Sequence, residues 1–351
     1  MNVAKSRTHQ AVIALLALSV LVIGGGAGAQ NGRQGDTSGL GAMGVVSIQS
    51  LALGDAEMVY AGSFGGGVFK SEDAGKTWRP ANEGLTDPFV YVVMVAPDKA
   101  VFAGTLRGGI FRSHNQGKSW APVNTGLERL ETHVLAHHQG SLYAGTGSGV
   151  YRSANGGTTW VSDNEGLKNL LIRAFAVDTD GSMYAGTTGM GIYRKDPGHA
   201  KWVRITATQL SHPRDRLPEN FVRALVADES GDLYAGTADN GVYVSGDRGD
   251  SWRVLGKGVE NASIRALAIG GSSWFAGTGQ GMYRSVDRGK TWVSINEGLT
   301  ERSVQAFAVG KEGLVYAGTN AGIFKTGDHG AHWVPINQGL GITPRVLAPA
   351  H

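Results

Sequence analysis

Three arginines in matching local sequences are the residues of this chain best suited to bind a charged ligand. Arg173, Arg223 and Arg265 each follow an aliphatic residue and precede an alanine and a further apolar run. A guanidinium group stays charged and can donate two parallel hydrogen bonds to one carboxylate or phosphate. Three of them in one place predict an anion-binding site. The alternative is structural, with each arginine bonded to a carbonyl of a neighbouring element or to a turn glutamate such as Glu297.

The same local sequence recurs once in each copy of an internal repeat. A tryptophan closes a short polar turn in every copy, and the spacing runs from 40 residues (Trp120 to Trp160) to 50 residues (Trp202 to Trp252). A period near forty residues is typical of stacked supersecondary units. The seven tryptophans are Trp78, Trp120, Trp160, Trp202, Trp252, Trp292 and Trp333.

Each copy holds four short apolar runs separated by Gly, Asn or Asp. In the sixth copy they are residues 263–268, 274–278, 281–285 and 292–296. Runs rich in aromatic and β-branched residues between such turns predict strands, and four strands per copy match a propeller blade. We therefore predict an all-β, seven-bladed β-propeller of four-stranded antiparallel blades with polar turns over residues 45–351.

The first strand of a propeller blade lies innermost, so the arginine register predicts a ring of side chains near one mouth of the central channel. We predict that Tyr91, His133 and Gln305 join the three arginines in binding a ligand at this mouth. Counted back from the Ala-Gly-Thr type run of each copy, the ring contains Gln49, Tyr91, His133, Arg173, Arg223, Arg265 and Gln305.

The C-terminal segment has the pattern of an additional strand. Residues 342–348 repeat the first strand of a copy for an eighth time, with Arg345 in the ring register. An open sheet edge exposes unpaired backbone groups. We therefore predict that this strand latches the ring by adding to, or replacing part of, the first blade near Val45.

A second departure from the repeat lies between the fourth and fifth copies. The turn before Trp202 loses the usual Ser, Asp and Gly, and an insertion follows over residues 206–221. Long loops in compact folds are commonly functional or disordered. We predict a partner-binding loop on the face of the arginine ring; a loop without a specific purpose is the alternative. Its candidate contact residues are His212, Arg214, Asp215 and Arg216.

The N-terminus has the features of a secretory signal peptide. Lys5 and Arg7 precede an apolar run, residues 11–23, and small residues follow up to residue 29. This arrangement predicts a signal peptide over residues 1–29, a flexible segment over 30–44 and a periplasmic or secreted protein. An uncleaved membrane anchor is the alternative. The chain has no cysteine, which excludes thiolate chemistry and is compatible with an oxidising compartment.

The formal charge argues against two classes of partner. The net charge is +3, and removal of Lys5 and Arg7 with the signal leaves +1 (3 − 2). A nearly neutral protein has no broad electrostatic basis for binding nucleic acid or anionic membranes. We expect a monomer whose partner is a protein, an acidic ligand or a glycan.

The polar turn before each tryptophan has its own physical logic. In residues 71–78, Asp73 can accept backbone hydrogen bonds, Gly75 can take a positive φ and Trp78 can bury its ring between strands. This Ser-x-Asp-x-Gly-x-Thr-Trp pattern resembles the Asp box of BNR-repeat propellers over about residues 45–341. That group includes sialidases, xyloglucan-type glucanases, sortilin-like receptors and photosystem II assembly factors. The resemblance implies a structural turn remote from the ligand face, with Asp73, Asn115, Asn155, Asp247, Asp287 and Asp328 at its acidic or amide position.

Catalytic members of this group have features that the chain lacks. Sialidases carry a Phe/Tyr-Arg-Ile-Pro motif; the nearest string here, Val203-Arg204-Ile205-Thr206, lacks the proline. Sialidases also have six blades, and xyloglucan-cleaving relatives use two propellers. We name no catalytic residue and expect a non-catalytic scaffold for protein binding or assembly. A carbohydrate-binding or glycoside-hydrolysing, sialidase-like propeller is the alternative.

Metal and cofactor chemistry has weaker support in the sequence. His133, His137 and His138 fall on one predicted strand, where residues four apart are about 13 Å from each other. Residues 178–181 (Asp-Thr-Asp-Gly) lack the downstream ligands of a calcium loop and are typical of a hairpin turn. We expect neither a metal nor a cofactor.

Overall fold

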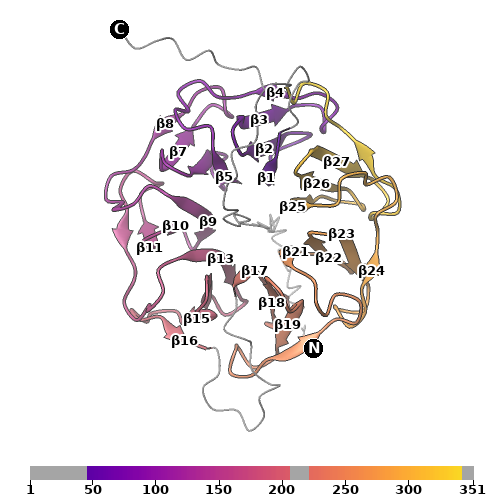
Figure 1. Cartoon of the computed structure of the whole chain (residues 1–351). Helices are drawn as coiled ribbons and strands as arrows, with labels where there is room; N and C mark the ends of the chain where they lie inside the picture. The colour runs from indigo at the N-terminus through magenta and orange to yellow at the C-terminus, as the bar shows by residue number, and fades with distance from the viewer. Residues whose placement is uncertain (1–45, 206–220, 342–351) are drawn as a thin grey trace, which may run out of the picture.

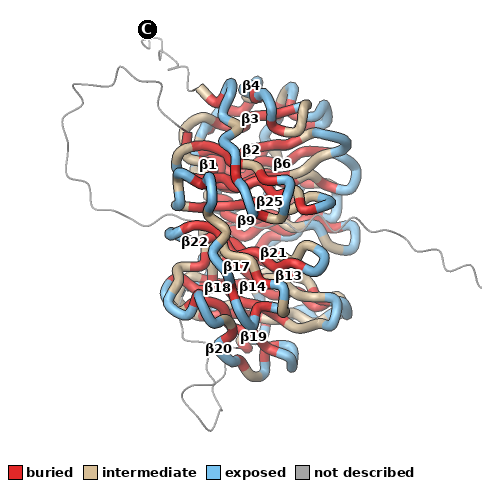
Figure 2. Tube along the Cα trace, turned by 90° about the vertical axis from the view of Figure 1, so that its right-hand side faces the viewer, coloured by how far each residue is buried: buried red, intermediate tan, exposed pale blue. Residues whose placement is uncertain are grey.

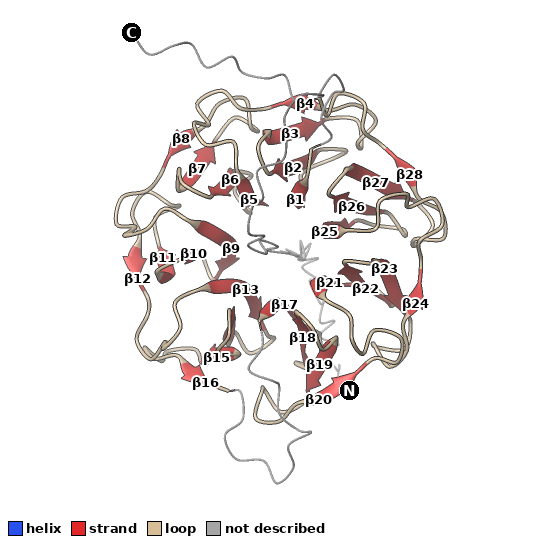
Figure 3. Cartoon of the chain, viewed as in Figure 1, coloured by secondary structure: helices blue, strands red, loops and turns tan. Residues whose placement is uncertain are grey.

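The computed structural model describes residues 46–205 and 221–341 as a ring of seven antiparallel four-stranded sheets (Figure 1). The described residues contain strands, turns and loops but no helix (Figure 3). A membrane-crossing helix is accordingly absent from these two ranges. The predicted seven-bladed, all-β propeller is confirmed.

Within every blade the strands follow chain order from the channel outward. The innermost strands are β1 (Ile48–Leu53), β5 (Val90–Val95), β9 (Thr132–His138), β13 (Ile172–Val177), β17 (Val222–Ala227), β21 (Ile264–Gly270) and β25 (Val304–Val309). The second strands are β2 (Val59–Ser63), β6 (Val101–Thr105), β10 (Ser141–Thr146), β14 (Met183–Thr187), β18 (Leu233–Thr237), β22 (Ser273–Thr278) and β26 (Val315–Thr319).

The third strands are β3 (Gly67–Ser71), β7 (Ile110–Ser113), β11 (Gly149–Ser153), β15 (Ile192–Lys195), β19 (Val242–Ser245), β23 (Gly281–Ser285) and β27 (Gly322–Thr326). The outer strands are short: β4 (Arg79–Pro80), β8 (Ala121–Pro122), β12 (Val161–Ser162), β16 (Val203–Arg204), β20 (Arg253–Leu255), β24 (Val293–Ser294) and β28 (Val334–Pro335).

The apolar runs become second strands because those strands are covered on both faces. Every residue of β2, β6, β10, β14, β18, β22 and β26 is buried, as a strand packed between two neighbouring sheets requires. Figure 2 shows the buried trace running through the body of the ring and the exposed trace in the connecting loops. The core therefore lies between blades and continues around the ring.

The glycine of the Ala-Gly-Thr run permits this close packing. A Cβ added at Gly145 would lie 2.3 Å from Cγ1 of Val134 and 2.7 Å from Cγ2 of Ile172 in the next blade. No real Cβ approaches another carbon so closely, so a side chain there would push two blades apart.

The polar turn has the hydrogen bonds that its sequence predicts. Asp73 Oδ1 accepts from the backbone N–H of Thr77 at 2.9 Å, and Ser71 Oγ accepts from the N–H of Gly75 at 2.8 Å. Gly75 has a φ of 87°. Trp78 is 4% exposed and fills the space between two blades. The predicted Asp-box turn is confirmed.

The indole N–H groups of five tryptophans (Trp78, Trp120, Trp160, Trp202 and Trp333) also join a blade to the preceding one. Trp120 Nε1 donates to the carbonyl of Ala81 at 2.7 Å, and Trp78 Nε1 donates to the carbonyl of Ile336 at 2.8 Å. The second bond connects blade one to blade seven and so closes the ring. Blade one already contains four strands from residues 48–80. The predicted latch (342–348), signal peptide (1–29) and flexible segment (30–44) lie outside the described residues.

Candidate functional site

Every residue of the predicted ring lies at a β-bulge of an innermost strand. In blade four, for example, Ile172 faces Thr187 and Ala174 faces Gly186, so Arg173 has no partner across the ladder. A bulge turns one side chain away from the regular alternation. The same irregularity occurs at Gln49, Tyr91, His133, Arg223, Arg265 and Gln305.

The bulges place the ring at one mouth of the channel. The innermost strands line the channel (Figure 1), and the bulge lies at the first residues of each strand. The connections that enter the first strand and those between the second and third strands lie at this end of the blades. The Asp-box turns, which connect third and fourth strands, lie at the opposite end.

Two of the arginines reach forward to a hydroxyl group of the next blade. Arg223 Nη1 donates to Ser263 Oγ at 3.2 Å, and Arg265 Nη1 donates to Ser303 Oγ at 2.7 Å. The structural alternative from the sequence named carbonyls and Glu297 as partners. The observed partners are hydroxyls, and Glu297 instead lies 3.7 Å from His332.

Arg173 reaches in the opposite direction around the ring. Its Nη1 lies 2.9 Å from Nδ1 of His133 in blade three, and its Nε donates to Thr188 Oγ1 at 3.3 Å. A guanidinium can only donate, so this contact requires His133 Nδ1 to be unprotonated. His133 Nε2 then faces Glu131 Oε1 at 3.1 Å.

None of the three arginines forms an ion pair with a carboxylate within the described part of the chain. Burial lowers the pKa of all three, and Arg223 lowers the pKa of both Arg173 and Arg265 by charge repulsion. The carboxylates of Glu131, Asp239 and Glu301 partly offset the lowered pKa of Arg173, Arg223 and Arg265, respectively, without forming an ion pair with them. Arginine remains protonated despite such shifts. Three half-buried positive charges on adjacent blades therefore lack a matching anion.

The other predicted ligand contacts are buried behind this surface. Tyr91 is 4% exposed, Gln305 is 6% exposed and His133 is not exposed. Burial lowers the pKa of His133, although Glu131 counteracts the shift. These side chains have little exposed surface with which to contact a ligand, so their role is to position neighbouring side chains. Gln305 does so for Asn320, to which its Nε2 donates at 2.9 Å.

The sequence comparison missed an aromatic platform beside the ring. Phe64 is 40% exposed and packs edge-on against Phe89 with ring centroids 4.9 Å apart. Phe64 also contacts Tyr91 at 5.8 Å, and Tyr91 contacts His133 at 5.1 Å. Arg107 covers Phe89 with its guanidinium carbon 5.9 Å from the ring centre. The platform could have been found in the sequence by comparing the residue that follows the second strand in each copy, because this residue is aromatic only in the first copy.

Backbone hydrogen bonds hold this platform rigid. Buried Asp87 accepts from the N–H groups of Phe89, Arg107 and Gly108 at 3.1, 2.6 and 2.8 Å. Phe64 and Phe89 also form an isolated β-bridge between blades one and two. One half of the mouth is therefore aromatic and the other half is cationic.

The predicted partner-binding loop lies outside the described residues, together with His212, Arg214, Asp215 and Arg216. The residue that follows it, Phe221, is 44% exposed. Metal binding finds no support in 46–205 and 221–341, where no three acidic, histidine or cysteine side chains are grouped to hold an ion. His133, His137 and His138 share strand β9, as the sequence predicts, and residues 178–181 form the turn between β13 and β14.

Comparison with known proteins agrees with the turn geometry. The family model of the BNR-Asp box repeat matches residues 282–295, the third strand and turn of blade six. The turn is a BNR-Asp box. The hydrogen bonds around Asp287 in this segment equal those around Asp73, with Thr291 N–H to Asp287 Oδ1 at 2.9 Å. No curated protein matches the sequence.

Solved structures share the fold of this BNR-Asp box propeller at low sequence identity. The extracellular domain of the one-component system BT4673 from B. thetaiotaomicron has a TM-score of 0.65 at 20% identity, over 81% of this chain and 38% of that one. A GH74 xyloglucanase from Xanthomonas campestris has 0.67 at 16%, over 85% and 55%. YCF48 bound to a D1 peptide has 0.62 at 14%, over 80% and 92%.

These relatives establish the fold alone. The chain spans well under two thirds of the sensor and xyloglucanase chains, and most of the length of YCF48. Both enzymatic and non-catalytic proteins share this architecture, so function must be argued from the site.

Proposed function

We propose that this protein is an exported, non-catalytic BNR-Asp box propeller that binds an anionic group of a protein partner at the arginine side of the channel mouth. The observation that carries the proposal is the set of three arginines on adjacent blades, none of which is ion-paired with a carboxylate of residues 46–205 or 221–341. Mutual repulsion and burial make this arrangement costly without a ligand. A carboxylate or phosphate placed between the guanidinium groups would relieve that cost.

The aromatic platform favours a partner that offers apolar surface next to its anion. Phe64 and Phe89 lie in the same mouth as the arginines, connected to them through Tyr91 and His133. Aromatic and arginine side chains are the residue types enriched at interface hot spots. A protein surface or chain segment supplies both chemistries. The peptide bound to YCF48 supports a peptide-binding use of this fold.

The carboxylates near the mouth argue against the glycosidase alternative. A glycosidase acid needs a raised pKa and a second carboxylate facing it across the substrate. The hydrogen bond from His133 lowers the pKa of Glu131. Asp87 is committed to three backbone N–H groups, and Glu301 accepts from the N–H of Ser303 at 2.7 Å.

The test is a cross-linked pull-down from the native envelope fraction, followed by affinity measurement with the captured partner. The variants replace Arg173, Arg223 or Arg265 with Gln. Each removes a hydrogen bond to a charged group worth about 1.5–3 kcal/mol, so affinity should fall roughly tenfold or more. Arg302→Gln is the matched control, because Arg302 is exposed just before β25 and lies three residues before the ring residue Gln305. A triple variant that captures the same partner with the same affinity would rule out the site.

A further inference from the structure

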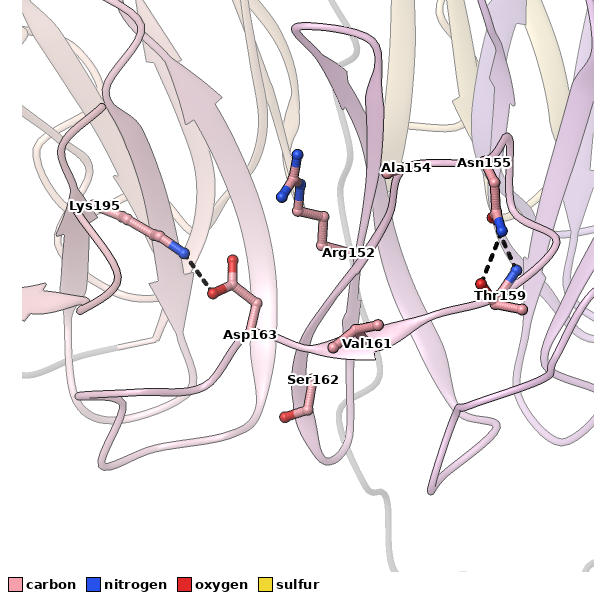
Figure 4. A pocket seen from close by; sticks show the side chains of 8 residues that line it. All are labelled: Arg152, Ala154, Asn155, Thr159, Val161, Ser162, Asp163 and Lys195. Carbon is pink, nitrogen blue, oxygen red and sulfur yellow. Dashed lines mark hydrogen bonds and ion pairs between the residues drawn. The ribbon is translucent and has the colours of Figure 1, made fainter. Parts of the chain in front are cut away.

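A cleft of about 410 Å³ lies between blades three and four, where Asn155 and Thr159 of the third Asp box form part of its lining (Figure 4). Arg152 on β11 and Lys195 at the end of β15 line it, with Asp163 just after β12 between them. Ser162 also lines it. The volume is within the range of small-molecule sites.

The cleft exists because this blade interface departs from the common packing. At five of the other six interfaces an apolar residue three positions after the tryptophan packs on the glycine of the next Asp box. A Cβ added at Gly249 would lie 2.2 Å from Ile205, and one added at Gly330 would lie 2.4 Å from Ile295. At the interface of blades three and four, this position three residues after the tryptophan is occupied by Asp163 and not by an apolar residue.

Charged residues replace two positions of the repeat together. Lys195 stands where the other boxes have Ser or Thr, and its ammonium group donates to Asp163 Oδ1. Trp202 supports both residues, because its ring lies 5.8 Å from Lys195 Nζ and its Nε1 donates to the carbonyl of Asp163 at 2.8 Å. The decayed fourth turn is thus compensated by an ion pair between blades.

One hydrogen-bonding atom of this group has no partner among the described residues. Asp163 Oδ2 is buried and accepts no hydrogen bond. The exposed Arg152 donates from Nε and Nη2 to Ser141 Oγ at 3.2 and 2.9 Å. In blade two the equivalent Arg112 crosses to the next Asp box and donates to the carbonyl of Gly156 at 2.7 Å. Among the residues that the structure describes, Arg152 has no such bond to blade four.

We propose that this cleft binds a singly protonated phosphate group, either free or as a phosphomonoester. Arg152 and Lys195 supply two positive charges against one negative charge on Asp163, which favours an oxyanion. Asp163 Oδ2 is closed to solvent, so a ligand that donates a hydrogen bond to it binds only after a neighbouring side chain moves aside, as the exposed Arg152 can. A protonated phosphate donates through its P–OH and accepts through its other oxygens. Sulfate has no proton to donate at neutral pH, so its oxygens would face the carboxylate and be repelled.

The site is tested by isothermal titration of the full chain with inorganic phosphate, sulfate and glycerol 3-phosphate at pH 6 and pH 8. Phosphate should bind at least tenfold more tightly than sulfate. A phosphomonoester has its second pKa near 6, so glycerol 3-phosphate should bind more tightly at pH 6 than at pH 8. Tighter binding of the ester than of inorganic phosphate at pH 6 would identify an organic phosphate as the source, and the reverse would identify the free ion. No phosphate binding, or equal binding of sulfate, would overturn the proposal.

Two substitutions test the assigned roles. Arg152→Gln should weaken phosphate binding at least tenfold, whereas Arg284→Gln should not change it. Arg284 is the matched control because it occupies the same register in blade six and donates from Nε to Ser273 Oγ at 3.0 Å. Equal losses from both variants would contradict the site.

Asp163→Asn should remove the preference for phosphate over sulfate, because an amide group can donate to a sulfate oxygen. An unchanged preference would show that Asp163 does not select the ligand. If this variant fails to fold, the comparison of Arg152→Gln with Arg284→Gln still decides whether the cleft binds phosphate. The arginines of the channel mouth take no part in either outcome.

Discussion

The hydrogen bond from Trp78 to Ile336 predicts a measurable difference between two tryptophans that look equivalent in the sequence. Trp78 and Trp292 are 4% and 6% exposed. The Nε1 of Trp78 donates across the first and last blades at 2.8 Å, whereas the Nε1 of Trp292 is buried and has no partner in the described part of the chain. Substitution by phenylalanine removes the same atoms at both positions, but only Trp78→Phe removes a hydrogen bond between blades.

The magnitude follows from the two environments. Both substitutions lose similar apolar contact, so that cost cancels in the comparison. Trp78→Phe also leaves the carbonyl of Ile336 without this donor, at about 1–3 kcal/mol. Trp292→Phe removes a buried donor that had no partner, which relieves a cost of similar size. The two terms add, so Trp78→Phe should be less stable than Trp292→Phe by about 4 kcal/mol, roughly 1000-fold in the folding equilibrium.

Urea denaturation followed by circular dichroism measures this difference without relying on tryptophan fluorescence. The two variants should share one m-value and differ in the midpoint. Trp120→Phe is a second reference, since its Nε1 donates to Ala81 at 2.7 Å and should cost as much as Trp78→Phe. The reasoning is refuted if Trp292→Phe proves as destabilising as Trp78→Phe.

Two further predictions concern acid stability and blade packing. Hydrogen bonds from Thr77 and Thr291 lower the pKa of Asp73 and Asp287 to about 2; a lowered pKa in the fold gives stability above about pH 4 that is lost as the pH falls toward 2. The second Asp box already has an asparagine, Asn115, at this position. The double variant Asp73→Asn/Asp287→Asn should therefore lose less unfolding free energy than the wild type between pH 4 and pH 2. Urea titrations at several pH values measure this, and an unchanged dependence on pH would contradict the prediction. Gly145→Ala should cost about 1–3 kcal/mol because its Cβ would lie 2.3 Å from a methyl group on β9. Gly327→Ala, with nothing within 4 Å, is the control, and equal unfolding midpoints for both alanine variants would rule out the packing argument.

The architecture could be predicted because its determinants are local. A run such as residues 274–278 predicts a strand from its own composition, and Asp287 and Gly289 specify their turn within a few residues. Repetition then made departures visible, which is how Arg173 and the decayed turn before Trp202 were found. The register of the ring also followed from counting, because each copy has nearly the same length.

The contacts between blades could not be predicted in the same way. The sequence placed His133 among ligand contacts, but the structure buries it beneath Arg173, since the bulge and the neighbouring blade decide which side chains reach the mouth. The platform of Phe64 and Phe89 escaped notice for the same reason, because its members come from different copies.

What the sequence alone determined was therefore the number of blades, the course of each strand and the turn that ends it, all of which depend on residues close together in the chain. Only the tertiary structure decided which polar groups remain unpaired. Asp163 and Lys195 are 32 residues apart and belong to different copies. Pairing across such a distance depends on how two blades pack, because hydrogen bonding and burial act through space and not along the chain.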